Sequence, residues 1–317
     1  MAEVASVLES MEPSGAEGAP PDGGAPGSEG APRRRRTEKS AFLRWVHPRG
    51  VTWGANLDDY DPDHVARVLE VVGRFFGPGR YFPLDVEGLG RVPPAPTMVV
   101  SNHSGGTTVL DAWGFAVAWY RHFGVGRPIR PAAHEMLLGN RWTGPFLARL
   151  GALQADRRIA ERVLRDWRHD LLVMPGGDLD VWRPFRERYR VRFGGRTGYA
   201  RLALTAGVPL VPVAHAGAHH TLLVLTDGRR FAERIGLPRV ARASIWPIHL
   251  SLPWGLALGP FPHLPMPVRL RYRVGDPIRP EDVGARSGEP PTARQVADVD
   301  ALVRVRLQRL LDDLAEG

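Results

Sequence analysis

Residues 97–112 read TMVVSNHSGGTTVLDA, and this stretch joins an apolar run to a glycine-rich turn and then to a helical pattern. The run Thr97–Ser101 has the length and β-branched content of a buried strand, and helical spacing over Leu110–His122 follows the turn. A strand that leads through glycines into a helix is typical of an α/β domain. Ligands of such domains bind beyond the carboxyl ends of strands, which is where His103 lies.

The same alternation of short apolar runs and amphipathic stretches continues along the rest of the chain. We therefore predict a single α/β domain with a mostly parallel central sheet flanked by helices. The other expected strands are Leu171–Met174, Leu210–Val213, Ala243–Pro247 and Val268–Val274. The other expected helices are His134–Leu150, Ile159–Trp167, Thr197–Ala206, His219–Ile235 and Ala293–Leu314.

The chain divides into four parts by composition. It has 317 residues, 43% of them hydrophobic, which suffices for a substantial core. Residues 1–40 are rich in Ala, Gly, Pro, Ser and Glu and end in a basic cluster, so we predict a disordered tail with acidic and basic parts. A helical segment at 41–95 suits packing on the core or docking on a membrane. The α/β pattern at 96–280 and a C-terminal helix at 281–317 form the other two parts.

The charge and residue content exclude several functions. The net charge of +8 favours anions such as nucleic acid, phospholipid headgroups or a phosphate-bearing cosubstrate. Basic residues interleaved with stacking aromatics are absent, so no nucleic-acid partner is predicted. The chain has no cysteine, which excludes disulfides and thiolate chemistry. No carboxylate motif accompanies His215, His219 and His220, so no metal site is predicted.

Residues 244–268 contain no Asp, Glu, Lys or Arg and are long enough to cross a bilayer. Prolines and glycines interrupt the stretch, however, and such a backbone could not satisfy its hydrogen bonds in lipid. Trp246, Trp254, Leu256 and Phe261 suit instead a loop that is buried in the fold or dips into the membrane interface.

Two strand ends carry candidate site residues. After the first, glycines around His103 let a substrate approach the backbone, and Asp111 could return to orient the imidazole. The second expected strand ends at a turn formed by Pro175, Gly176, Gly177 and Asp178. Because the carboxyl ends of parallel strands meet at one sheet edge, the two turns can face one cleft. Arginines and a second glycine-rich helix start at 193–198 follow, which is typical of an anion site.

These stretches resemble the glycerolipid acyltransferase superfamily, whose members share the blocks N-H-x4-D, G-x-x-F-x-x-R, F-P-E-G-T-R and V-P-V. The blocks occur here in the same order, and the resemblance covers roughly residues 95–280. The matching residues are Asn102 and His103 with Asp111 in the first block, Gly151 with Arg157 in the second, Pro175, Gly176 and Gly177 in the third, and 208–213 in the fourth.

Two departures from the family pattern bear on the acceptor. Seven residues rather than four separate His103 from Asp111, and Gly176 stands where enzymes with phosphate acceptors carry glutamate. The third block with the following 193–203 resembles instead the branch that contains diacylglycerol and monoacylglycerol acyltransferases. A neutral glycerolipid is therefore a candidate acceptor.

The resemblance implies an O-acyltransferase that moves a fatty acyl group from acyl-CoA or acyl carrier protein to a glycerolipid hydroxyl. The acceptors it allows are lysophosphatidate, lysophospholipids and mono- or diacylglycerol, in phospholipid or neutral lipid synthesis. His103 would take the hydroxyl proton, Asp111 would hold the imidazole tautomer, and transfer would be direct. No cofactor is expected beyond acyl-CoA as co-substrate. We expect a peripheral protein at the cytoplasmic face of the membrane.

The substrate-binding residues expected from this resemblance lie on the two turns and among the arginines: Asn102, Ser104, Gly105, Gly106, Arg157, Pro175, Gly176, Gly177, Asp178, Arg183, Arg196 and Arg201. Amides of the turn 104–106 would meet the oxyanion, and the arginines would bind phosphates. Two alternatives remain open. The altered blocks allow a lipid-binding relative without catalysis, and His with Asp allows a lipid hydrolase, although no G-x-S-x-G motif is present.

Overall fold

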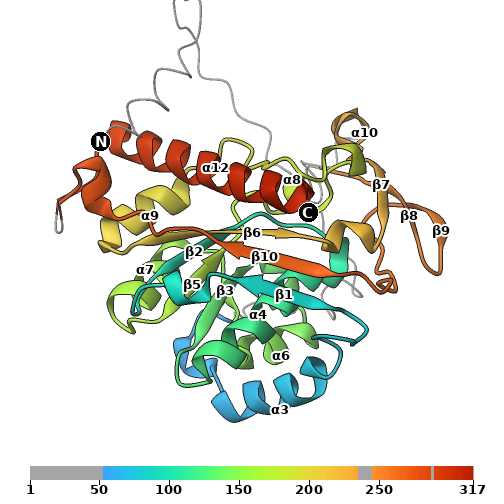
Figure 1. Ribbon diagram of the computed structural model, residues 1–317, viewed down its shortest axis with the longest axis horizontal. Helices are drawn as coiled ribbons and strands as arrows, with labels where there is room; N and C mark the ends of the chain where they lie inside the picture. Colours follow the sequence, from blue (N-terminus) through green and yellow to red (C-terminus); the bar gives the residue numbers. More distant parts are fainter. Residues whose placement is uncertain (1–52, 235–244, 287–288, 317) are drawn as a thin grey trace, which may run out of the picture.

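The computed structural model describes residues 53–234, 245–286 and 289–316 (Figure 1). The expected tail at 1–40 lies outside these residues, as does the start of the helical segment expected at 41–95. The described chain forms a single α/β domain in which a mostly parallel sheet has helices on both faces, as predicted.

The main sheet has seven strands in the order β1-β10-β6-β2-β5-β3-β4. The five strands from β6 to β4 run parallel, whereas β10 is antiparallel to β6 and β1 runs parallel to β10. The bounds are β1 Leu84–Glu87, β2 Met98–Ser101, β3 Ile129–Ala133, β4 Leu153–Gln154, β5 Asp170–Val173, β6 Leu210–Ala216 and β10 Leu270–Val274. Four of the five strands expected from the sequence are confirmed, as β2, β5, β6 and β10.

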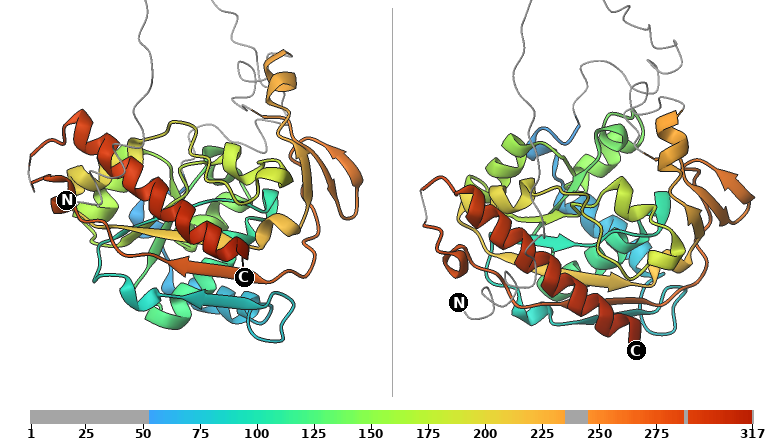
Figure 2. Two further views of the ribbon diagram at one scale, coloured as in Figure 1. Left: turned by 45° about the horizontal axis from the view of Figure 1, so that its top comes forward. Right: turned by 90° about the horizontal axis from the view of Figure 1, so that it is seen from above.

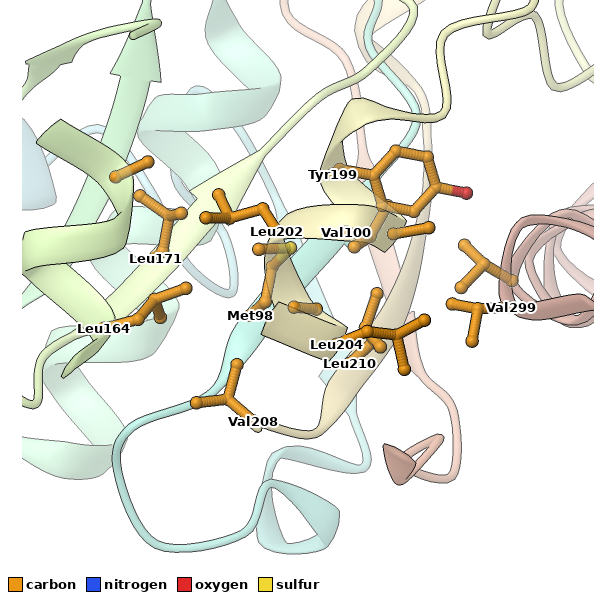
Figure 3. Close-up of a cluster of buried hydrophobic side chains, with 14 of the residues drawn as sticks. Met98, Val100, Leu164, Leu171, Tyr199, Leu202, Leu204, Val208, Leu210 and Val299 are labelled. Atoms are coloured by element: carbon orange, nitrogen blue, oxygen red, sulfur yellow. The ribbon is translucent and has the colours of Figure 1, made fainter. Parts of the chain in front are cut away.

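Strand β2 lies between β5 and β6, and its side chains alternate between two cores. Met98 and Val100 pack on one face with residues of α7 (Arg157–Arg165), α9 (Gly198–Ala206) and α12 (Ala293–Glu316) (Figure 3). Val99 packs on the other face with residues of α3 (Pro62–Gly73) and α4 (Leu110–Phe123). Burial on both faces explains why this strand has no polar residue before Ser101.

Helix α12 lies diagonally across one side of the molecule (Figure 2) and contacts β6 and β10. Its buried residues recur at helical spacing: Val296, Val299, Leu302, Val303, Leu307, Leu311 and Leu314. The expected helix Ala293–Leu314 is thereby confirmed.

The helix expected at His134–Leu150 is wrong as one continuous element. It forms two short helices, α5 (Glu135–Leu138) and α6 (Thr143–Arg149). Between them, Asn140 Oδ1 accepts hydrogen bonds from the backbone N–H groups of Trp142 (2.9 Å) and Thr143 (3.3 Å). An asparagine side chain that binds nearby amides in this way competes with the helical hydrogen bonds and interrupts the helix.

The helix expected at His219–Ile235 is also wrong over most of its length. Its residues form a short 3-10 turn (Ala218–His220), strand β7 (Leu223–Thr226) and helix α10 (Arg229–Arg234). Between β7 and α10, Gly228 has φ of +62°, and an added Cβ would collide with the carbonyl oxygen of Trp246. Because only glycine readily adopts this positive φ and fits this close approach, the chain turns at Gly228.

Strand β7 belongs to a second, antiparallel sheet with β8 (Ile248–Ser251) and β9 (Gly255–Leu258). The strand expected at Ala243–Pro247 is not observed in the described part of that range, 245–247, because the strand begins after the proline. Pro247 has no N–H to donate to a ladder. Within the described ranges no helix is both long and apolar enough to cross a membrane.

The boundary expected at residue 96 lies inside the folded unit. The segment 41–95 holds α3, as expected, and Asp61 caps this helix by accepting a 2.8 Å hydrogen bond from His64 N. It also holds β1, which pairs with β10 in the main sheet. The α/β domain therefore begins before β2.

Candidate active site

His103 lies on the turn that follows β2, and glycines shape this turn. Gly105 and Gly106 have φ of +97° and +62°, which favour glycine. A Cβ on Gly105 would stand 3.2 Å from Ala218 Cβ, so the turn packs closely against the segment after β6. Val109, at φ +43°, adopts a strained conformation for a β-branched residue just before α4.

The His103 imidazole and the Asp111 carboxylate form a hydrogen-bonded pair. Nδ1 of His103 lies 2.6 Å from Oδ2 of Asp111, which is the first acidic residue of α4. The carboxylate is fully buried, whereas the imidazole is 14% exposed. In neutral histidine, donation from Nδ1 leaves the lone pair on Nε2. The pair therefore presents a proton acceptor at Nε2.

Backbone amides hold the Asp111 carboxylate in place. Oδ2 also accepts a 2.9 Å hydrogen bond from Ser104 N, and Oδ1 accepts one of 2.9 Å from Ala112 N. The Tyr272 hydroxyl on β10 donates to the Asp111 carbonyl oxygen at 2.7 Å. The Ser104 amide is thus engaged by Asp111 and is not available to an oxyanion, contrary to the expectation. The amides of Gly105 and Gly106 remain for that role.

Charge around His103 sets its protonation. Burial disfavours the imidazolium, but the Asp111 carboxylate with its hydrogen bond, together with Asp180, outweighs this and raises the pKa of His103. For Asp111 burial acts in the opposite sense, yet His103 and His215 hold its pKa below the ordinary value. Asp111 therefore stays ionised, and His103 becomes a base above its raised pKa.

A second buried carboxylate connects the turn after β5 to His103. Oδ2 of Asp180, on α8 (Asp178–Val181), accepts a 2.6 Å hydrogen bond from the backbone N–H of His103. Asp180 also pairs with the buried Arg183, and both side chains are almost inaccessible to solvent. Burial raises the pKa of Asp180, against the effect of Arg183. This contact places the two turns next to each other at one edge of the sheet, as expected.

Strand β6 completes the surroundings of the turn through His215. The side-chain amide of Asn102 donates to His215 O and accepts from His215 N, both at 2.9 Å. His215 Nε2 lies 2.7 Å from Ser104 Oγ, and burial lowers the pKa of His215 to about 4, so the ring is neutral. Asn102 and Ser104 are both buried, which makes them supports of the turn rather than the substrate contacts that we expected.

The turn at 175–178 has no room for a larger residue at Gly176. A Cβ there would collide with the Asp180 side chain and the Arg192 carbonyl oxygen. Arg196 holds the same turn, because its guanidinium donates to Pro175 O at 3.0 Å, to Gly176 O at 2.8 Å and to Asp178 Oδ1 at 2.9 Å. The turn is therefore braced from within the protein.

The four arginines expected to bind phosphate differ in their accessibility. Arg183 is buried and paired with Asp180, and Arg196 is half-exposed while it braces the turn. Arg201 is exposed on α9. Arg157 is exposed at the first position of α7, directly after β4. Among the described residues, neither Arg157 nor Arg201 forms a hydrogen bond or ion pair with His103, Asp111 or Asp180.

Arg157 nevertheless lies at the same edge of the sheet as His103. Strands β4 and β2 run parallel and are separated by β3 and β5. Three strand spacings amount to about 14 Å, given ~4.8 Å between neighbours. A cosubstrate that extends along this edge could contact both residues.

The small cavity beside the turn is lined by Ser104, Gly105, Arg183, Phe185 and His219, among others. Its volume of about 10 Å³ matches a single water molecule at most. In the part of the chain that the structure covers, no three His, Asp or Glu side chains are placed to hold a metal ion.

Sequence reasoning missed Asp180, His215 and Tyr272 as parts of the site. Asp180 directly follows the glycine turn that was singled out, so its position was the available signal. His215 lies two residues beyond the fourth block, where a polar residue within a fully buried strand was a weaker signal.

Residues 83–216 match the family model described as Acyltransferase. This range begins at β1, ends with β6 and contains both turns of the site. The segment that carries both turns is therefore an acyltransferase domain, in agreement with the family resemblance drawn from the sequence.

Several relatives are similar over much of the chain. An uncharacterized protein of Mycobacterium tuberculosis is 26% identical over 277 residues, which cover 86% of this chain and 73% of that protein. The human "DGAT1/2-independent enzyme synthesizing storage lipids" is 26% identical over 199 residues, which cover 61% and 53% respectively. Among solved structures, the 1-acyl-sn-glycerophosphate (LPA) acyltransferase PlsC from Thermotoga maritima has a TM-score of 0.45 and 16% identity, over 81% of this chain and 78% of that one.

Proposed function

We propose that the protein transfers a fatty acyl group from acyl-CoA to a hydroxyl of a neutral glycerolipid, mono- or diacylglycerol. The observation that carries this is the His103–Asp111 pair, whose 2.6 Å hydrogen bond at Nδ1 leaves Nε2 as the basic nitrogen within an acyltransferase domain. The human relative whose name refers to storage lipids supports a neutral acceptor. So does Gly176, where a glutamate could not fit beside Asp180.

The geometry supports direct transfer. His103 Nε2 accepts the proton of the acceptor hydroxyl while that oxygen attacks the thioester carbonyl carbon. The carbonyl oxygen gains negative charge, which the amides of Gly105 and Gly106 would stabilise. The C–S bond then breaks, the ester forms, and the leaving thiolate takes the proton from the imidazolium. Asp111 stabilises the charged imidazolium between the two proton transfers.

The acceptor is tested with purified protein, radiolabelled acyl-CoA and a panel of lysophosphatidate, lysophosphatidylcholine, monoacylglycerol and diacylglycerol. We expect labelled ester with the neutral acceptors at the highest rate. A higher rate with lysophosphatidate would contradict the neutral acceptor. Labelled free fatty acid without ester would indicate the hydrolase alternative, and an unconsumed donor would indicate a lipid-binding relative.

Arg157 is proposed to bind phosphates of the donor. It is exposed at the start of α7, at the same edge of the sheet as His103. Arg157→Ala should raise KM for acyl-CoA by about tenfold at unchanged kcat, because charge-assisted bonds to phosphate act equally in the ground and transition states. Arg158→Ala, the adjacent exposed arginine, is the matched control. An unchanged KM, or a loss in kcat instead, would show that Arg157 has another role.

An acceptor embedded in a bilayer requires the enzyme to work at a membrane surface. We propose peripheral binding on the side from which acyl-CoA is supplied, the cytoplasmic face.

A further inference from the structure

The second sheet has one face made of aliphatic side chains. Its register places Leu223, Leu250 and Leu256 in one row across the three strands, and Ile248 and Leu258 next to each other in another. Leu256 and Leu258 are 61% and 56% exposed. The outer face of an antiparallel sheet normally carries polar residues when it faces water.

The opposite face of this sheet packs on the body of the protein. Val224, His249 and Ala257 are buried there, and the His249 ring lies 5.1 Å from that of Trp182. The alternation of buried and exposed residues fixes which face points outward. The aliphatic face is therefore the outer surface of a well-packed sheet, and its exposure does not result from loose structure.

The segment that follows β8 extends this apolar surface. Leu252, Trp254, Phe261, Leu264 and Met266 are all large, apolar and between 42% and 63% exposed. Together with the aliphatic face they define the docking surface. No charged residue occurs from 244 to 268, so the docking surface contains none.

The docking surface adjoins the active site. The hydroxyl of Thr107 on the catalytic turn donates to Phe261 O at 3.3 Å. A Cβ on Gly106 would lie 3.0 Å from the His263 ring. The sheet itself stands out from the body beyond the end of β6 (Figure 2), at the edge of the main sheet where His103 lies.

Positive charge lies beside the docking surface. Helix α10 follows β7 directly, and its exposed Arg230 and Arg234 line one hollow together with the exposed Phe231. An aromatic residue between arginines, next to an uncharged apolar surface, matches the composition of proteins that bind at the interface of anionic membranes. The charge complements a bilayer with anionic headgroups.

We propose that the docking surface inserts into the interfacial layer of an anionic bilayer and so places the His103 site where a glycerolipid acceptor can enter from the membrane. This inference rests on the proposed function for the identity of the acceptor. A lipid bilayer is the occupant that fits the docking surface, because this surface lacks any charge, has arginines at its side and lies against the turn that would receive a lipid.

The test is sedimentation with vesicles of phosphatidylcholine and phosphatidylglycerol, using the full chain. Leu256→Ser and Leu264→Ser should each lower the partition coefficient by about tenfold, because each removes one large apolar side chain from the interface. Val125→Ser is the matched control, since Val125 is 39% exposed on the loop that precedes β3, at the opposite sheet edge. Its partitioning should equal that of the wild type. Equal partitioning of the wild type and of the variant that carries both Leu256→Ser and Leu264→Ser would overturn the proposal.

A second measurement does not depend on a variant that weakens binding. Vesicles with brominated acyl chains should quench part of the tryptophan fluorescence, and the quenched part should be smaller in Trp254→Phe. Trp254 is 55% exposed on the docking surface. Identical quenching in both proteins would also overturn the proposal.

Two further measurements distinguish a lipid bilayer from other occupants of the docking surface, and distinguish a failure of this proposal from a failure of the proposed function. If the surface binds a second copy of the chain, light scattering would show a dimer that the leucine substitutions dissociate. Vesicle binding would then be unchanged by these substitutions. This outcome contradicts the proposal. Acyl transfer is measured in parallel. Vesicle binding that needs the two leucines without any acyl transfer would refute only the proposed function, whereas acyl transfer with unchanged vesicle binding in the variants would refute only the docking surface.

Discussion

His103→Ala should lower kcat/KM for acyl transfer by about 10²–10⁴-fold, the contribution typical of a positioned general base. The imidazole is the group whose Nε2 can take the hydroxyl proton, and alanine provides no substitute for it. Because Asp111 keeps its bonds from the amides of Ser104 and Ala112, the turn should remain folded in the variant.

The control for this variant is His122→Ala, which removes an exposed histidine at the far end of α4 and should leave the rate unchanged. Thermal unfolding of both variants is measured beside the rate. A well-folded His103→Ala protein that keeps its activity to within about threefold, far below the range for a general base, would refute the mechanism.

Asp111→Asn should lower the maximal kcat/KM by about 10²-fold, the lower end of the same range, and should also move its pH dependence. In the wild type, the Asp111 charge is the main group that raises the pKa of His103, so the acidic limb of the profile lies above the ordinary histidine value. Without that charge, burial lowers the pKa of His103. The free base then persists to lower pH, and the limb shifts toward acid.

The measurement is kcat/KM as a function of pH for both proteins. If Asp111 had only a structural role, its replacement would reduce the rate or the stability, but the acidic limb of the pH profile would stay in place. An unshifted acidic limb in a folded Asp111→Asn protein would therefore contradict the assignment of Asp111 as the charge partner of the base.

The parts of the site that lie close together in the sequence could be predicted from it. Strand β2, the glycine turn and the start of α4 form one continuous stretch, so His103 and Asp111 were identified together. Asp180, His215 and Tyr272 come from α8, β6 and β10, and their contacts depend on strand order and register. A single sequence carries little information on either.

The missed strand β3 shows how tertiary contacts override local preference. It contains Arg130 and Pro131, which do not suggest a buried strand. Arg130 is nevertheless fully buried, because its guanidinium donates to Gly151 O at 2.9 Å and lies over the Tyr60 ring. Such compensation is visible only once Gly151 and Tyr60 are in place.

The second sheet was missed for a different reason. Apolar residues in a row, as in Leu222–Leu225, are compatible with a helix or a strand. The alternation in β8 also has the opposite sense to that of a water-facing sheet, because His249 and Ser251 are buried while Ile248 and Leu250 lie on the outer face. The membrane contact that we propose for this outer face would account for the inverted pattern.

The most direct test of the central claim is the stoichiometry of the reaction catalysed by the purified wild-type protein. Free CoA thiol and acylated glycerolipid are quantified together, with and without diacylglycerol in the vesicles. Direct acyl transfer predicts that CoA release depends on the acceptor and that one ester forms for each thiol released. CoA release at the same rate without acceptor, with free fatty acid as the product, would contradict the account.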